Sequence, residues 1–134
     1  MKLALLCSVL LAAVAAGVAH GTTPSCGAYS IGPGAVRNGN ADGATCMLRK
    51  YRSCRPAMYV LAAFGVDTES TTAFRIVRIG SACHVSVYAT FRVVPQTPHR
   101  YYGTCHRIQR LAGDIVATGC TGTLPATISL TGGH

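Results

Sequence analysis

The chain of 134 residues is long enough for one domain, and its 49% hydrophobic and 12% charged residues exclude disorder over most of its length. Twelve Lys and Arg against four Asp and Glu give a formal net charge of +8. A basic chain favours anionic partners such as nucleic acids, cell-wall polymers, acidic glycans or lipid headgroups. A positive net charge also keeps a protein soluble, so the charge by itself does not indicate a particular function.

The first 19 residues are typical of a secretory signal peptide. A short positive start at Lys2 precedes an almost unbroken apolar run over residues 3–18, and small residues then allow cleavage before His20 or before Thr22. A retained membrane anchor is the alternative, but the run is short for a spanning helix. We therefore expect a mature chain without a transmembrane segment, secreted or held on the periplasmic or outer side of a cell envelope.

The mature chain divides into an irregular N-terminal arm over residues 20–41, a single domain over residues 42–131 and a frayed C-terminus over residues 132–134. Several glycines and two prolines interrupt any periodic pattern in the arm, which predicts irregular structure there. The final Gly-Gly-His has neither apolar residues nor strand formers, which predicts fraying.

A helix is predicted at the start of the domain. Asp42 is a plausible N-cap, and Ala44, Met47, Leu48 and Tyr51 follow at the i, i+3, i+4, i+7 spacing of one helical face. The helix must end near residue 53, because Arg55 precedes a proline and is biased away from helical backbone angles.

The rest of the domain is predicted to be strands. The clearest pattern is period-two alternation over residues 83–94, which places Val85, Val87 and Phe91 on one face and His84, Tyr88 and Arg92 on the other. The other expected strands cover residues 57–64, 71–79, 100–111, 115–120 and 126–130. For residues 57–64 a second helix is the alternative, because a short apolar run fits either structure.

These elements predict an α+β fold, with one short N-terminal helix packed on an antiparallel β-meander of about five or six strands. A core of this size is modest, so disulfide bonds are expected to supply part of the stability.

Six cysteines remain after the signal peptide, which in a short secreted chain predicts three disulfides. A hairpin centred between residues 112 and 113 places Cys105 directly opposite Cys120. Cys46 lies off the apolar face of the helix, where the arm can cross it, which favours a Cys26–Cys46 bond. Cys54–Cys83 is the pair that remains.

The same counting of hairpin positions predicts the neighbours of the two strand histidines. It places Cys105 opposite Ala89, His106 opposite Tyr88, and His84 near Arg110. The two histidines then lie two pairing positions apart on the outer face of the sheet. With a nearby cation they could serve as the acid and base of a small secreted ribonuclease-like hydrolase, although exposed strand histidines without a role are the simpler interpretation.

A third chemistry depends on the cleavage site. If the mature chain begins at His20, its amine and imidazole together could chelate Cu(II), with a second histidine completing a copper-binding module. No His or Cys spacing in the sequence indicates a preformed metal site, and a residue incidental to signal cleavage is the alternative.

Arginines and tyrosines gather on the later strands. On an open sheet face they could hold anionic groups and stack rings, or they could form an ordinary solvated surface. The candidate ligand-binding residues are Tyr88, Arg92, Arg100, Tyr102 and Arg110.

No nucleophile elbow, phosphate-binding loop or dinucleotide fingerprint is present, and no cofactor is implied. The sequence therefore favours a secreted, basic, disulfide-stabilised binding or structural module that is not an enzyme and whose ligand is an anionic polymer or cell-envelope surface. The ribonuclease-like hydrolase and the copper-binding module remain the alternatives.

Overall fold

The computed structural model describes residues 25–33 and 41–132. The predicted signal peptide, the candidate cleavage sites at His20 and Thr22, and residues 133–134 lie outside these ranges. Within them the chain is mostly β, with one helix, largely antiparallel sheets and three disulfides. No helix in the described ranges is long and apolar enough to cross a membrane.

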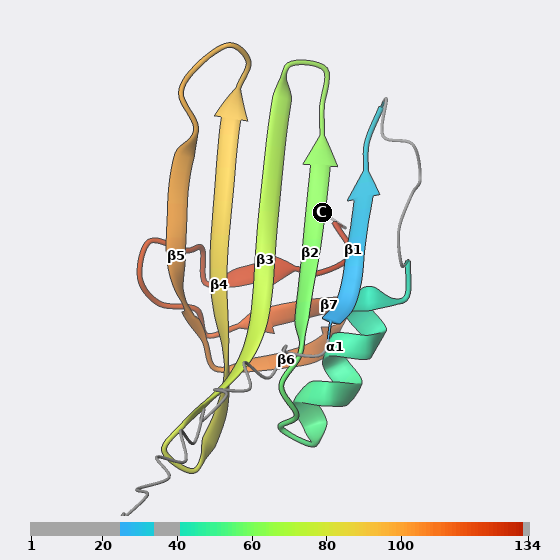
Figure 1. Cartoon of the computed structure of the whole chain (residues 1–134), viewed down its shortest axis with the longest axis vertical. Coiled ribbons are helices and arrows are strands. Elements are labelled where there is room, and N and C mark those ends of the chain that lie inside the picture. The colour runs from blue at the N-terminus through green and yellow to red at the C-terminus, as the bar shows by residue number, and fades with distance from the viewer. Residues whose placement is uncertain (1–24, 34–40, 133–134) are drawn as a thin grey trace, which may run out of the picture.

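The strands form two sheets (Figure 1). One has five strands in the order β1-β2-β3-β4-β5, and the other has three in the order β6-β7-β8. Among the strands of residues 25–33 and 41–132, only β1 and β2 pair in parallel. The elements are β1 (Ser25–Ile31), α1 (Gly43–Arg52), β2 (Met58–Phe64), β3 (Thr68–Ile79), β4 (Ala82–Val93), β5 (His99–Cys105), β6 (Arg107–Leu111), β7 (Asp114–Thr118) and β8 (Thr127–Ser129).

The expectation of a single meander is wrong because the predicted strand over residues 100–111 breaks at His106 into β5 and β6. The His106 amide donates to the carbonyl oxygen of Thr118 in the second sheet, at 3.0 Å. Its own carbonyl oxygen accepts a hydrogen bond from the Tyr51 hydroxyl at 2.6 Å, which satisfies a backbone group at the corner. The chain therefore turns at His106 and lays β6 across the first sheet.

Part of the expected irregular arm is a strand. Ser25–Ile31 forms β1 and pairs in parallel with β2, with a register irregularity between Ser25 and Gly27. Gly27 has a φ of 87°, a left-handed backbone angle that glycine adopts without a steric penalty. The glycines that suggested irregular structure thus mark a bulge at the start of this strand.

Other boundaries differ by a few residues. The expected strand over residues 57–64 is β2, which begins at Met58, and not a helix. Because β3 begins at Thr68, the turn before it is shorter than expected. At the C-terminal end of the described residues, the Gly132 amide donates to the Ser129 hydroxyl at 2.9 Å. The Thr131 hydroxyl also hydrogen-bonds the Asp114 carboxylate, which ties this end of the chain to β7.

The core lies between the inner face of the five-stranded sheet and a layer made by α1 and the three-stranded sheet. Tyr59, Phe74 and Val85 from the large sheet and Met47 from α1 are all almost fully buried. Figure 1 shows the short strands crossing only the lower half of the long ones. For this reason the inward-facing residues of β4 are buried at Val85 and Val87 but exposed toward its C-terminal end.

The three disulfides are Cys26–Cys46, Cys54–Cys83 and Cys105–Cys120, the pairs expected from the sequence. They join β1 to α1, the end of α1 to β4, and the end of β5 to the segment after β7. Three disulfides suggest an oxidising, extracellular environment.

The predicted register between β4 and β5 is wrong by four residues. Cys105 lies opposite Val85 and not Ala89, because the chain turns tightly after Val93, whose carbonyl accepts the Gln96 amide at 2.6 Å. A shift by an even number leaves every side chain on its predicted face but changes its partners. Cys105 is therefore inward as expected, while Tyr88 faces Tyr102 and not His106.

Candidate ligand-binding face and histidine pair

The outer face of the five-stranded sheet, opposite to α1 and the second sheet, gathers most of the candidate residues. Side chains alternate along a strand, so residues that flank the buried Val85, Val87 and Cys105 point outward. Four of the five predicted ligand-binding residues lie on this face, together with one more arginine. We call this set the Arg/Tyr face: Arg75, Tyr88, Arg92, Arg100 and Tyr102.

Two tyrosines form the centre of the face. Tyr88 on β4 and Tyr102 on β5 are directly opposite partners, and they remain 47% and 63% exposed. Directly opposite side chains have Cβ atoms about 4.5–5.5 Å apart. The pair thus presents two neighbouring aromatic side chains to solvent.

Two arginines flank this pair on opposite sides. Arg100 lies opposite Thr90, and Arg75 lies opposite Ser86, so each is a diagonal neighbour of Tyr88, one on β5 and the other on β3. Diagonal neighbours are within reach of aromatic and long side chains. Both arginines are exposed.

The fifth member of the face is partly neutralised. The Arg92 guanidinium lies 2.6 Å from a carboxylate oxygen of Glu69, its directly opposite partner on β3, and both side chains are 40% exposed. Arg92 Nε also donates to the same oxygen at 2.8 Å. The Glu69 carboxylate therefore offsets the charge of Arg92 at one end of the Arg/Tyr face.

Arg110 does not join the other candidates. It lies on β6 in the three-stranded sheet, where its partner is the buried Ile115. The sequence placed it near His84 through the incorrect β4–β5 register. The exposed Arg110 therefore serves as a reference position away from the Arg/Tyr face.

The two strand histidines are nearest neighbours, in contrast to the expected gap of two pairing positions. The imidazole centroids of His84 and His106 are 5.3 Å apart, with the ring planes at 56°. His84 Nδ1 is buried and has no hydrogen-bond partner among the described residues. Arg75 is a diagonal neighbour of His84 as well as of Tyr88, so it lies between the histidine pair and the tyrosine pair.

Tyr51 supports the backbone beneath the histidines. Its hydroxyl lies 2.6 Å from the His106 carbonyl oxygen and 3.1 Å from that of Cys83. Burial raises the pKa of Tyr51, and the charge of Arg107 opposes part of this effect. The phenol therefore stays protonated and fixes the residues next to both imidazoles. The sequence assigned Tyr51 only to the apolar face of the helix and gave no sign of this role.

No complete metal centre is present in the described ranges, where no three His, Cys, Asp or Glu side chains cluster closely enough to hold an ion. The histidine pair offers two nitrogen donors. His20, the residue on which the copper hypothesis depends, lies outside the described residues.

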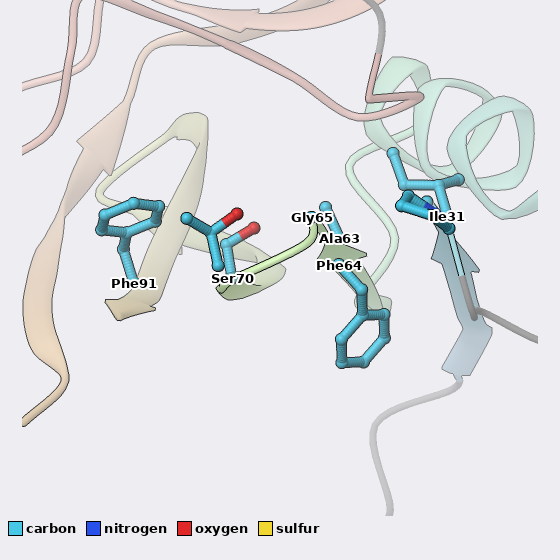
Figure 2. Close-up of a pocket in the computed structure, with 9 residues that line it drawn as sticks. Ile31, Ala63, Phe64, Gly65, Ser70 and Phe91 are labelled. Carbon is cyan, nitrogen blue, oxygen red and sulfur yellow. The ribbon is translucent and has the colours of Figure 1, made fainter. Parts of the chain in front are cut away.

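A separate apolar pocket of about 400 Å³ lies at the uncovered end of the inner face. In Figure 2, Ile31 and Phe91 lie on opposite sides of it, with Ala63 and Ser70 between them. A second pocket of about 330 Å³ shares Phe91 and extends toward Leu124. Among the residues that the structure describes, no charged side chain lines either pocket, so these linings do not favour an anionic ligand.

Two residues of the outer face, Arg75 and Glu69, are not among the site residues predicted from the sequence. A signal for them existed, because the tight connection at Gly80 and Ser81 fixes the pairing of β3 with β4. Counting outward from it gives Arg75 opposite Ser86 and Glu69 opposite Arg92, as the structure has them.

No family model, curated protein or solved structure matches the chain. The functional interpretation consequently depends on the residues of the chain itself.

Proposed function

We propose that the protein is a secreted, disulfide-stabilised binding module that is not an enzyme and that holds an anionic extracellular ligand on its Arg/Tyr face. The observation that carries the proposal is the exposed Tyr88–Tyr102 pair with Arg75 and Arg100 on its two diagonals. Solvent-exposed aromatic side chains beside cations provide both contact area and charge for a ligand.

Three features of the chain support this role. The predicted signal peptide and the three disulfides fit an extracellular or cell-envelope location. The excess of Lys and Arg over Asp and Glu, from which removal of the signal peptide takes only Lys2, favours association with anionic polymers or surfaces. The five-stranded sheet fixes the backbone positions of the arginines and tyrosines before a ligand arrives, which lowers part of the entropic cost of binding.

Binding of heparin, used as a generic anionic polymer, tests the proposal. Arg100→Gln and Tyr102→Ser are each expected to weaken binding about tenfold, whereas Arg110→Gln, which removes the same charge from the other sheet, should change it less than twofold. Equal losses in Arg100→Gln and Arg110→Gln would show that net charge alone drives binding. Absence of binding at low salt would contradict the proposal outright.

A ribonuclease-like hydrolase is the second candidate, and it is favoured by the 5.3 Å separation of the His84 and His106 rings. One imidazole would take the proton of an RNA 2′-hydroxyl as that oxygen bonds to phosphorus. The other would protonate the departing 5′ oxygen, which leaves a 2′,3′-cyclic phosphate and a 5′-hydroxyl. Arg75, diagonal to His84, would stabilise the charge that develops on the phosphate.

Incubation with RNA separates this candidate from a binding module. Cleavage to cyclic phosphate ends that is lost in both His84→Ala and His106→Ala would establish the hydrolase. His99→Ala, which removes an exposed histidine at the start of β5, is the matched control and should leave cleavage unchanged. RNA that stays intact with the folded protein would remove this candidate.

A copper-binding module that uses His20 remains the third candidate. N-terminal sequencing of the secreted protein tests it, because a mature chain that begins at Thr22 lacks the chelating residue.

A further inference from the structure

We infer that the ligand of the Arg/Tyr face is a single-stranded nucleic acid, with a base on the Tyr88–Tyr102 pair and phosphates at Arg75 and Arg100. This inference rests on the proposed anion-binding function and narrows it to one class of ligand.

The tyrosine pair is the feature that favours single-stranded nucleic acids over other anions. An arginine cluster alone would suit any anion, but the centre of the face is aromatic and 47–63% exposed. Single-stranded nucleic acids carry both a charged backbone and free base faces, and bind where cations follow the backbone and aromatic side chains stack with bases. In a duplex the bases stack on each other, so only its phosphates remain for such a surface.

The spacing of the arginines indicates a short oligomer and not a mononucleotide. Arg75 on β3 pairs with Ser86, and Arg100 on β5 pairs with Thr90. The two arginines are therefore two strands apart across the sheet and four residues apart along β4. With a rise of about 3.4 Å per residue and about 4.8 Å between strands, their Cα atoms are about 17 Å apart. Two phosphates of one strand match this separation better than a single phosphate does, so affinity should grow with oligonucleotide length until the strand spans both arginines.

Peptide binding by strand addition is disfavoured at the neighbouring edge of the sheet. The side of β5 that faces away from β4 is hydrogen-bonded to the segment after β7. The Thr123 amide donates to the Tyr102 carbonyl oxygen at 3.1 Å, and the Thr121 amide donates to the Thr104 carbonyl oxygen at 3.0 Å. The Tyr102 amide donates to the Thr123 hydroxyl at 2.9 Å. A peptide would have to displace these bonds to extend the sheet.

Fluorescence anisotropy with labelled oligothymidine tests the inference, since DNA lacks the 2′-hydroxyl and cannot be cleaved by the histidine pair. Affinity should rise with length to a plateau and exceed that for a duplex of equal length at least tenfold. Replacing a tyrosine by serine should weaken binding about 5- to 150-fold, because base stacking contributes about 1–3 kcal/mol. Tyr88→Phe and Tyr102→Phe should retain it, since they keep the ring.

The controls distinguish failure of this inference from failure of the proposed function. Heparin binding without preference for single strands would overturn the inference and leave anion binding intact. Loss of binding to both ligands would overturn both. A preference for single strands that persists in the Tyr88→Ser, Tyr102→Ser double variant, confirmed as folded by circular dichroism, would also overturn the inference. Arg110→Gln should behave as the unmodified protein with every ligand.

Discussion

Replacing Glu69 by glutamine should strengthen anion binding, because it releases Arg92 at the end of the Arg/Tyr face. Arg92 makes two contacts with one Glu69 carboxylate oxygen, at 2.6 and 2.8 Å. Arg92 and Arg100 are diagonal neighbours across β4 and β5, so the released guanidinium adds a cation beside an existing one. Both partners of the ion pair are 40% exposed, and such pairs contribute only about 0–1 kcal/mol to stability, so the Glu69→Gln variant should fold.

The size of the effect follows from counterion release. One additional phosphate contact should steepen the slope of log affinity against log salt concentration by about 0.7 for a single strand. Between 200 and 50 mM salt, a fourfold change, this slope makes the advantage of the variant about 2.6-fold larger at the lower concentration. Oligothymidine anisotropy across this salt range measures both the affinity and the slope.

Asp42→Asn is the matched control for this experiment. It removes the same formal charge at the N-cap position of α1, where the Asp42 side chain makes no capping hydrogen bond, contrary to the expectation from the sequence. The control should leave the salt slope unchanged. An unchanged slope in Glu69→Gln, or an equal increase in Asp42→Asn, would refute the assignment of Arg92 to the ligand-binding face.

The remaining predictions concern stability. Burial alone would raise the pKa of Asp114, but hydrogen bonds from Thr131, Ser129 and the Ile115 amide outweigh it and hold the pKa below its ordinary value. The ionised carboxylate should therefore stabilise the folded state at a pH above the ordinary pKa, and this stabilisation should disappear as the pH falls through the lower pKa of the folded state. In urea unfolding between about pH 5 and 2, the free energy of unfolding should accordingly depend less on pH in Asp114→Asn than in the parent. An unchanged pH dependence would contradict this role. Tyr51→Phe should lower the free energy of unfolding by about 1 kcal/mol, because it removes the hydroxyl that bonds the His106 carbonyl; an unchanged urea midpoint would show that water replaces it. Gly103→Ala should destabilise by about 1–3 kcal/mol, since its Cβ would lie 1.9 Å from the Thr121 carbonyl oxygen, and a thermal melt equal to the parent's would disprove this close packing.

Local pattern was sufficient for much of the fold. The apolar spacing around Met47 and Leu48 gave a helix whose predicted face is buried, and the alternation over residues 83–94 gave a strand with the predicted facing. The disulfide Cys105–Cys120 followed from one hairpin, because a tight turn fixes the pairing of the residues on either side of it. In these cases the determining interactions lie within a few residues of one another along the chain.

The candidate site was predicted less well, and the reason is register. Pattern assigned Tyr88, Arg92, Arg100 and Tyr102 to one face, but the four-residue error in the β4–β5 hairpin hid the partnership of Tyr88 with Tyr102. A period-two pattern repeats after every second residue, so it cannot distinguish registers that differ by four.

The sequence alone was sufficient for α1, for β2, β3, β4, β7 and β8, for the buried sides of α1 and β4, and for the cysteine pairs. The point at which the chain leaves the first sheet depends on contacts between segments that lie far apart in the chain. The break at His106 depends on the Tyr51 hydroxyl, which lies 55 residues away in sequence. That corner separates Arg110 from the other arginines and brings His106 against His84. Contacts between distant segments carry no local sequence pattern, because each is formed only when the second sheet packs across the first.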